Sequence, residues 1–162
     1  MMRHNLSLGD FPPDPFVWPQ AYRGVTSRRM LSYLVDAMII GLMVVCLHLL
    51  LGMAAFMTFG LLGFLYAFAV PILAGVVALI YHTSCLSGPW CSTIGMRLFG
   101  LRAHHIDGGP LTPPQAFVHT LFFYGTLGFG AGILLLIALF NPRRRTLHDF
   151  VAGVVILRHS GA

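Results

Sequence analysis

The stretch RRMLSYLVD, residues 28–36, decides how the rest of this sequence is interpreted. It places the guanidinium groups of Arg28 and Arg29 at the start of a long apolar run, and the carboxylate of Asp36 inside that run. The next formally charged residue along the chain is Arg97. Because long stretches without ionised side chains are typical of segments surrounded by lipid, this gap indicates a chain embedded in a membrane.

The composition extends that conclusion to the whole chain. Of its 162 residues, 57% are hydrophobic and 9% are charged, whereas soluble globular domains carry roughly a quarter charged residues. All basic residues are arginines and all acidic residues are aspartates, with a formal net charge of +5. This excess is typical of positive-inside topology, and attraction to anionic headgroups is the alternative. Without a basic stripe interleaved with aromatic residues, the sequence predicts no nucleic-acid partner.

The apolar segments predict an all-α membrane protein with three transmembrane helices. The first helix is expected over about residues 28–51, capped by Thr26 or Ser27. The second is expected over about residues 61–81, after a turn over residues 52–60. Each of these helices has the roughly 20 apolar residues that a bilayer crossing needs.

The third segment, residues 113–140, begins with a strong helix-start pattern. Thr112 precedes two prolines and is followed three residues later by Gln115, as in a capping box. We therefore expect a third crossing, with a broken or re-entrant path as the alternative. The break would lie in a cluster of glycines that permits close helix approach, namely Gly125, Gly128, Gly130 and Gly132.

The remaining segments are expected at the membrane surface. Residues 1–27 are rich in proline and form an N-terminal interfacial segment, whereas residues 28–158 form the transmembrane domain. Within residues 82–111, apolar residues at helical spacing predict a short interfacial element in the loop. The short amphipathic C-terminal tail includes residues 151–157, which are too few to cross and are expected as a strand or half-buried segment.

The arginines test this topology. Three crossings separate the tail arginines from those of the N-terminus and the 82–111 loop, whereas the positive-inside rule favours all of them in the cytoplasm. A spanning hairpin within residues 113–140 would restore agreement, but its length of about 42 Å is too short for two passes of about 30 Å. The side of the tail therefore stays open. The arginines expected to anchor the protein at the membrane surface are Arg28, Arg97, Arg102, Arg143, Arg144 and Arg145.

Asp36 is the candidate functional residue that most needs a partner, because a charge at the centre of a membrane helix costs about 2.5–3.5 kcal/mol. Arg29 lies on nearly the same helical face but about 10 Å away along the axis, so a third group would satisfy the geometry better. Asp149 in the tail is the candidate, and we predict a polar cluster of Arg29, Asp36 and Asp149. The alternative is purely structural: the arginines anchor the helix and Asp36 pairs within the fold.

These three residues also carry a resemblance to a known family, the RDD membrane proteins. That family is named for an arginine at the start of the first membrane helix, an aspartate within it and a second aspartate farther on. The matching residues are Arg29, Asp36 and Asp149. The resemblance covers about residues 22–158 and implies an integral membrane protein, with cation or proton exchange proposed for some members.

One block departs from the family pattern. The segment that starts STIGMRLFG at residue 92 resembles the link after the second helix, where the start Thr-Pro-Gly-Lys is common. This chain instead has Thr93, Ile94, Gly95 and Met96. A role of the family's lysine therefore does not carry over to this chain.

The other reactive side chains do not indicate a metal site or a catalytic site. The cysteines and histidines of the loop do not have the compact spacing of a metal site, so we expect no metal and no cofactor; they are His82, Cys85, Cys91, His104 and His105. No glycine-rich phosphate loop and no nucleophile in a recognisable catalytic setting occurs in the sequence. We therefore expect no enzymatic activity.

Two functions from different classes remain open. The first is a small multi-pass protein of the bacterial inner membrane, with a cytoplasmic N-terminus, that transports or binds a cation, a proton or a small solute through its arginine and aspartate cluster. The second is a non-catalytic accessory or assembly subunit of a larger membrane complex. Because three short crossings leave little room for a pathway, the expected partners are the lipid bilayer and either further copies of the chain or a larger complex.

Overall fold

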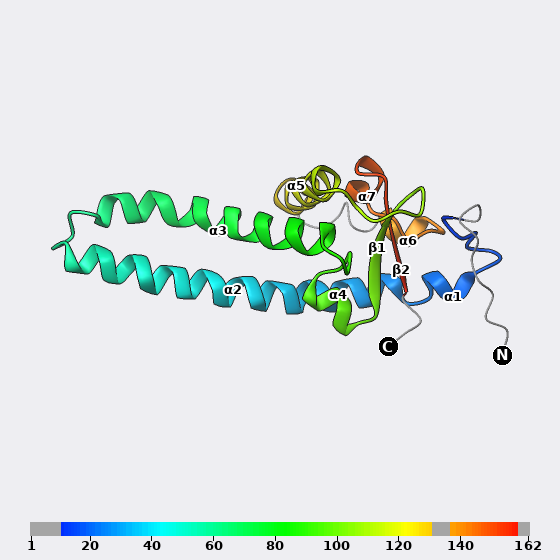
Figure 1. Ribbon diagram of the computed structural model, residues 1–162, viewed down its shortest axis with the longest axis horizontal. Helices are drawn as coiled ribbons and strands as arrows, with labels where there is room; N and C mark the ends of the chain where they lie inside the picture. Colours follow the sequence, from blue (N-terminus) through cyan, green and yellow to red (C-terminus); the bar gives the residue numbers. More distant parts are fainter. Residues whose placement is uncertain (1–10, 131–136, 159–162) are drawn as a thin grey trace.

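The computed structural model describes residues 11–130 and 137–158, and it is mostly helical. The helices and strands follow in the order α1 (Pro19–Tyr22), α2 (Val25–Met57), α3 (Gly63–Ser87), α4 (Ile94–Leu98), β1 (Leu101–His105), α5 (Pro113–Gly130), α6 (Ile137–Phe140), α7 (Leu147–Val151) and β2 (Val154–Arg158). A long hairpin of α2 and α3 projects from a smaller part that contains the other elements (Figure 1). We call this smaller part, together with the adjoining ends of α2 and α3, the base.

Helix α2 is longer than the sequence predicts at both ends. It begins at Val25, directly after Gly24, whose φ of +69° is a backbone conformation that glycine adopts without steric cost. The predicted caps Thr26 and Ser27 therefore lie inside the helix. At the other end the helix continues through Gly52 to Met57, so the turn into α3 comes later than predicted.

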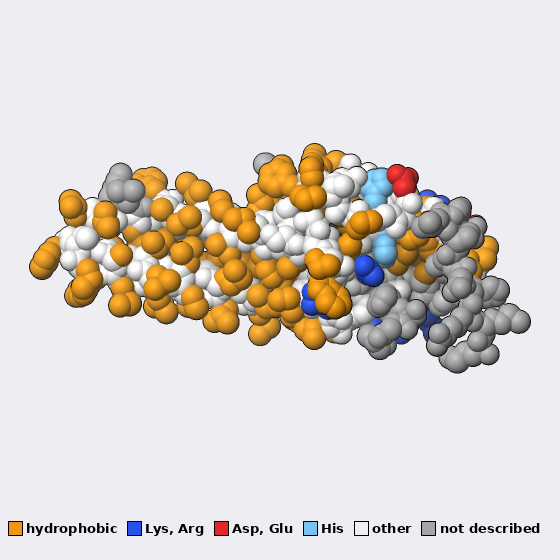
Figure 2. All heavy atoms as spheres, in the orientation of Figure 1, with side chains coloured by type: hydrophobic (Ala, Val, Ile, Leu, Met, Phe, Trp, Pro, Cys, Tyr) orange, Lys and Arg blue, Asp and Glu red, His pale blue; other side chains and the backbone are white. Residues whose placement is uncertain are grey.

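Both helices of the hairpin are long and apolar enough to cross a membrane. The apolar stretches lie within residues 19–57 and 66–87, and only 6% and 24% of their most apolar windows are buried inside the protein. The core helix of a soluble protein would instead be mostly buried. Figure 2 shows hydrophobic side chains along the length of the hairpin. Since such a surface is stable only in an apolar surrounding, the chain is a membrane protein.

The third predicted crossing is not confirmed. Helix α5 has 18 residues and is drawn nearly end-on in Figure 1, across the hairpin rather than along it, where it packs against α3 and α7. Its predicted start is correct, because the backbone N–H of Thr112 donates to Oε1 of Gln115 over 3.0 Å. Of the glycines at which a break was expected, Gly125, Gly128 and Gly130 lie inside α5, and Gly132 lies outside the described residues. Hydropathy identifies residues 113–140 as an apolar segment, but it contains no information on how that segment is oriented relative to the hairpin.

The last element that the structure describes is a strand, which the all-α prediction does not include. Strand β2 pairs antiparallel with β1, with Leu101 opposite Arg158 and His105 opposite Val154. A strand was one of the two forms expected for the tail. Its first four residues are all buried, however, so the predicted amphipathic character is not confirmed for β2.

The pairing of β1 with β2 also holds the C-terminal tail, through β2, at the base. A small apolar core forms around the two strands, and its buried members are Val25, Leu86, Met96, Leu101, Ala103, Leu111, Ala116, Ala152, Val154 and Ile156. The loop after α3 and the C-terminal tail are therefore neighbours in space. Every arginine that the structure describes belongs to the base: Arg23, Arg28, Arg29, Arg97, Arg102, Arg143, Arg144, Arg145 and Arg158.

Candidate functional site

Two clusters of buried polar side chains lie in the base, and each is built around one aspartate. The Arg29–Asp149 cluster joins the first turns of α2 to α7 and α5. The Asp36 cluster lies farther along α2 than Arg29, and it joins α2 to α3 and α4. Because both aspartates are at most 1% exposed, each must find all its hydrogen-bond partners inside the protein.

Arg29 and Asp149 form a two-pronged ion pair. Nη1 of Arg29 donates to Oδ2 of Asp149 over 2.5 Å, and Nη2 donates to Oδ1 over 3.1 Å. The hydroxyl of Tyr33, one helical turn after Arg29, accepts two further bonds from the guanidinium, from Nε over 3.2 Å and from Nη2 over 3.0 Å. This geometry requires the planar fork of arginine, which lysine does not offer.

The local fold of α7 positions Asp149. The backbone N–H of Thr146 donates to Oδ2 of Asp149 over 2.8 Å, and the hydroxyl of Thr146 donates to the same oxygen over 2.8 Å. Asp149 thus occupies the third helical position of a capping box and satisfies a free donor at the start of the helix. The carboxylate of Asp149 therefore both caps the start of α7 and links this helix to α2.

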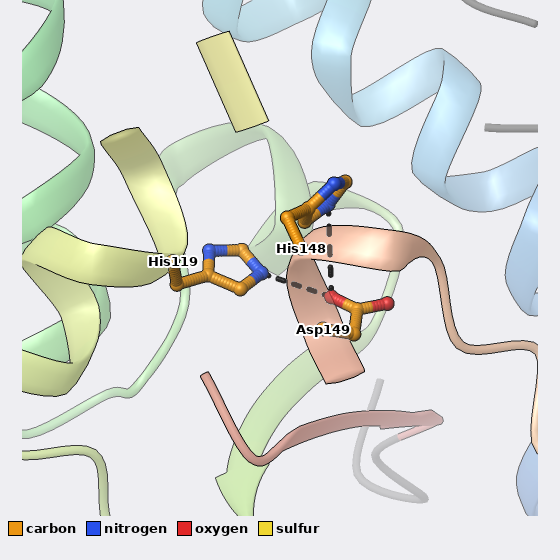
Figure 3. A group of neighbouring side chains, drawn as sticks. All are labelled: His119, His148 and Asp149. Carbon is orange, nitrogen blue, oxygen red and sulfur yellow. Dashed lines mark hydrogen bonds and ion pairs between the residues drawn. The ribbon is translucent and has the colours of Figure 1, made fainter. Parts of the chain in front are cut away.

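Two histidines complete this cluster, as Figure 3 shows. Nε2 of His119, which projects from α5, lies 2.9 Å from Oδ1 of Asp149. Nε2 of His148 lies 3.2 Å from Nη2 of Arg29, and the two imidazole rings meet edge to face at 4.8 Å. Both side chains are buried. Through His119 the cluster also holds α5 against α7.

The protonation states in α7 follow from these contacts. Burial alone would raise the pKa of Asp149, but the Arg29 guanidinium and the hydrogen bond with His119 outweigh it and hold that pKa well below its usual range. Burial lowers the pKa of His148 to about 3. At neutral pH the pair is therefore an ionised aspartate beside a neutral imidazole, which suits the adjacent guanidinium.

The Asp36 cluster satisfies its carboxylate with three donors. The hydroxyl of Tyr81 donates to Oδ1 over 2.7 Å, the hydroxyl of Thr93 donates to Oδ2 over 2.6 Å, and the backbone N–H of Gly95 donates to Oδ1 over 2.9 Å. Thr93 also caps α4, because its side chain accepts from the backbone N–H of Met96. These charge-assisted bonds offset the cost of burying Asp36.

Gly95 makes the close approach of α4 to α2 possible. A Cβ at this position would overlap the backbone oxygen of Ser32 and lie 2.9 Å from the carboxylate of Asp36. Because one of these neighbours is backbone, it cannot move aside cheaply. Of the four residues at the start of the 93–96 block, the glycine is thus the one that this packing requires.

The three predicted site residues are divided between the clusters. Arg29 and Asp149 meet directly, whereas the carboxylate of Asp36 accepts from Tyr81, Thr93 and Gly95. All three nevertheless lie at the same end of the hairpin. The single cluster of the sequence prediction is therefore two separate ones.

The arginines predicted to anchor the protein have mixed environments. Arg28, Arg102 and Arg144 each donate to a backbone carbonyl, of Phe99, Pro89 and Leu139 respectively. Arg97 stacks over Trp90, with 4.3 Å between its Cζ and the ring centroid. Arg145 is only 6% exposed and donates to the carbonyls of Val154 and Asp149, so its role is to hold the base together rather than to contact headgroups. For the side chain of Arg143, the structure gives no hydrogen bond within the described ranges.

Sequence reasoning missed most of the supporting residues. Thr146 had a usable signal, because Thr-x-x-Asp is the spacing of a capping box. A lone histidine in an apolar segment, such as His119, indicates a bond to a neighbouring helix or a proton relay, but not which residue it meets. Tyr81 and Thr93 had no signal, since they reach Asp36 only through the tertiary fold.

His119, His148 and Asp149 together offer two nitrogens and an oxygen within 4.8 Å of one another, a set that can hold a metal ion (Figure 3). Arg29 already contacts this set, at 3.2 Å from His148 and 2.5 Å from Asp149. An ion between these atoms would face a guanidinium at contact distance. The arrangement therefore suits a guanidinium better than a metal, and the absence of a metal centre stays a prediction.

Comparison with known proteins identifies a family. The sequence model of the RDD family matches residues 23–153, which include both clusters and most of the chain. No curated protein and no solved structure matches the chain.

Proposed function

The chain belongs to the RDD family, and on that premise we propose that it is a non-catalytic accessory or assembly subunit of a larger membrane complex. The observation that carries this proposal is the state of its charged site residues. Arg29, Asp36 and Asp149 are all buried, and their polar atoms are bonded to other parts of the same chain. Groups that are already paired in this way hold a fold together and are not free to bind a cargo.

We further propose that the hairpin crosses the bacterial inner membrane twice, with the base in the cytoplasm. From Asp36 to Met57, α2 rises about 32 Å, and from Gly63 to Tyr81, α3 rises about 27 Å, both close to the roughly 30 Å of a hydrocarbon core. The Asp36 cluster then lies at the cytoplasmic boundary. Two crossings also put the N-terminal and C-terminal arginines on one side, as the positive-inside rule favours.

The hairpin supplies a surface for assembly. Two helices do not enclose a pathway, and the described part of the hairpin beyond Asp36 contains no Arg, Lys, Asp or Glu. Large apolar side chains instead face outward, among them Leu42, Leu49, Met53, Phe68, Ile72 and Val76. Helices of a partner can pack against these faces within the bilayer.

Purification in a mild detergent from the native cells tests this proposal. A stoichiometric second membrane protein should accompany the tagged chain, as identified by mass spectrometry. Replacing Phe68, Ile72 and Val76 by alanine changes one face of α3, and replacing Leu42, Leu49 and Met53 changes one face of α2. The two variants are matched in size, and the partner should be lost only from the variant whose altered face it contacts. Recovery of the chain alone, as a monomer or self-assembled species, would refute the accessory role.

A second candidate, transport of a cation or proton by a homo-oligomer, is favoured by a different observation. Nε2 of His82 and Nδ1 of His119 are buried and have no hydrogen-bond partner within the described residues. Unpaired imidazole nitrogens inside a membrane protein are suited to exchange protons. Several copies would be needed to enclose a pathway.

Flux measurements distinguish this candidate. Purified chain in vesicles should dissipate an imposed pH gradient, and His82→Gln should slow the flux at least tenfold while the protein stays folded. His48→Gln is the matched control, because its Nδ1 lies 2.9 Å from the carbonyl of Val44 on its own helix. Flux equal to that of empty vesicles would exclude transport by this chain alone.

A further inference from the structure

An open cleft in the base lies between two segments that are far apart in the sequence. One wall is formed by Pro15 to Gly24, which includes α1, and the other by Pro142 and Arg144. Its volume of about 460 Å³ is within the range of small-molecule sites. Tyr22 fixes the first wall, since its hydroxyl donates to the carbonyl of Pro13 over 2.8 Å. The side chains that form the two polar clusters do not line this cleft, although the backbone carbonyl of Arg144 accepts from Nη1 of Arg29 over 3.5 Å.

The cleft is positively charged. Arg23 and Arg144 line it, and the exposed guanidinium of Arg23 has no hydrogen bond to the protein among the residues that the structure describes. Arg144 uses Nη1 to donate to the carbonyl of Leu139, and the other two nitrogens of its guanidinium have no hydrogen bond in the described ranges. Two guanidiniums with free donors are suited to the oxygens of a phosphate group.

Nearby carboxylates do not cancel this charge. Asp149 is already paired with Arg29. Asp14, the other described acid near this wall, accepts from the backbone N–H of Phe16 over 2.9 Å and does not line the cleft. The cleft therefore keeps an excess of positive charge.

The rim of the cleft is apolar and exposed. The side chain of Phe16 is 85% exposed and that of its neighbour Val17 is 65% exposed. Exposed aromatic residues beside arginines are typical of segments at the headgroup level of a membrane. We propose that this cleft binds a phosphate group, carried by an anionic phospholipid headgroup or free in solution, with Arg23 and Arg144 as the residues that contact its oxygens.

Calorimetric titration of the full chain in a neutral maltoside detergent tests the site. The probes are dihexanoyl phosphatidylglycerol, dihexanoyl phosphatidylcholine and inorganic phosphate. Saturable binding of phosphatidylglycerol but not of phosphate assigns the site to a lipid, whereas binding of both assigns it to phosphate groups in general. Binding of neither overturns the proposal.

Variants locate the site. Arg23→Gln should weaken binding about tenfold, the effect of losing one charge-assisted contact. Arg144→Gln should weaken it by a similar factor. Arg97→Gln is the control, because it removes the same charge from α4, outside the cleft, and should change binding less than twofold. Equal losses for Arg23→Gln and Arg97→Gln would show attraction to net charge alone and would overturn the proposal.

Discussion

The guanidinium of Arg29 and the carboxylate of Asp149, 120 positions apart in the sequence, form two hydrogen bonds with each other. Their side chains are only 4% and 0% exposed. The pair joins the start of the first long helix to the short helix before the last strand. Because the same carboxylate begins α7, the start of the tail cannot fold independently of α2. The ion pair therefore couples the two ends of the chain.

Breaking this pair from one side should destabilise the base strongly. Arg29→Met leaves an ionised carboxylate buried without its partner, which typically costs about 3–5 kcal/mol. We expect a large decrease in the thermal unfolding midpoint in detergent, measured by circular dichroism. Asp149→Asn should also destabilise the base, because it leaves the buried guanidinium of Arg29 without its counter-ion, although the amide oxygen can still accept from the backbone N–H of Thr146.

The double variant separates a specific pair from two independent losses. Arg29→Met combined with Asp149→Asn removes both charges, so it should be more stable than the sum of the single effects predicts. Arg29→Lys keeps the charge but not the fork, and should lie between the wild type and Arg29→Met. Strict additivity of the two single effects would contradict a direct pair.

The contact of α4 with α2 should not tolerate a methyl group at Gly95. Gly95→Ala places a Cβ against the backbone oxygen of Ser32, and overpacking of this kind costs about 1–3 kcal/mol. Thermal unfolding should show the loss. Gly41→Ala is the matched control, since a Cβ there meets no atom within 4 Å and alanine favours the helix. Equal midpoints for the two variants would contradict the described packing.

Acid should destabilise the base in two stages. The folded-state pKa of His148, about 3, is below the ordinary value of about 6.5, so the unfolded chain takes up this proton first. Stability should therefore be complete above about pH 6.5 and fall as the pH decreases towards 3. The pKa of Asp149 is also lowered, so its contribution is present above about pH 4 and is lost below it, as the pH falls through the folded-state pKa.

Denaturant midpoints between pH 7 and pH 4 measure the first stage. One histidine contributes a slope of up to about 1.4 kcal/mol per pH unit. His148→Gln removes this group and should give a flatter curve over the same range, whatever its stability at pH 7. His104→Gln is the control, because this histidine is only partly buried, on β1. Parallel curves for His148→Gln and the wild type would refute the assignment.

The sequence was sufficient for the features that depend on local patterns. Apolar length predicted α2 and α3, and the pairing of Thr112 with Gln115 predicted the start of α5. The end of α2 lies later than predicted, because Gly52 is inside the helix, where even an added Cβ would meet the Tyr66 ring only at 4.0 Å. A glycine inside a helix and one that ends a helix have the same letter.

The candidate site could be predicted only in part. Asp149 was predicted only as a third group between Arg29 and Asp36, and the family resemblance indicates the same residue, since no local rule joins residues so far apart. Asp36 was assigned to the same cluster because its own partners give no sequence signal. One of them is the backbone N–H of Gly95, a group that almost every residue has, and its position depends on the path of the chain after α3.

Cysteine labelling tests the proposed two crossings. In a chain whose three native cysteines are replaced by alanine, single cysteines are introduced as Gln20→Cys in α1, Phe59→Cys in the hairpin turn and Arg158→Cys in β2. All three native side chains are exposed in the structure. An impermeant maleimide is then added to vesicles of each orientation.

The pairing of β1 with β2 predicts which of these cysteines react from the same side of the membrane. Because β2 is hydrogen-bonded beside the loop that follows α3, cysteines at positions 20 and 158 should react from the same side, which the arginines predict to be cytoplasmic. The cysteine at position 59 should react only from the other side. A third crossing within residues 113–140 would instead move position 158 to the side of position 59. Labelling of positions 20 and 158 from opposite sides would therefore refute both the two-crossing topology and the contact of Arg29 with Asp149 in the membrane.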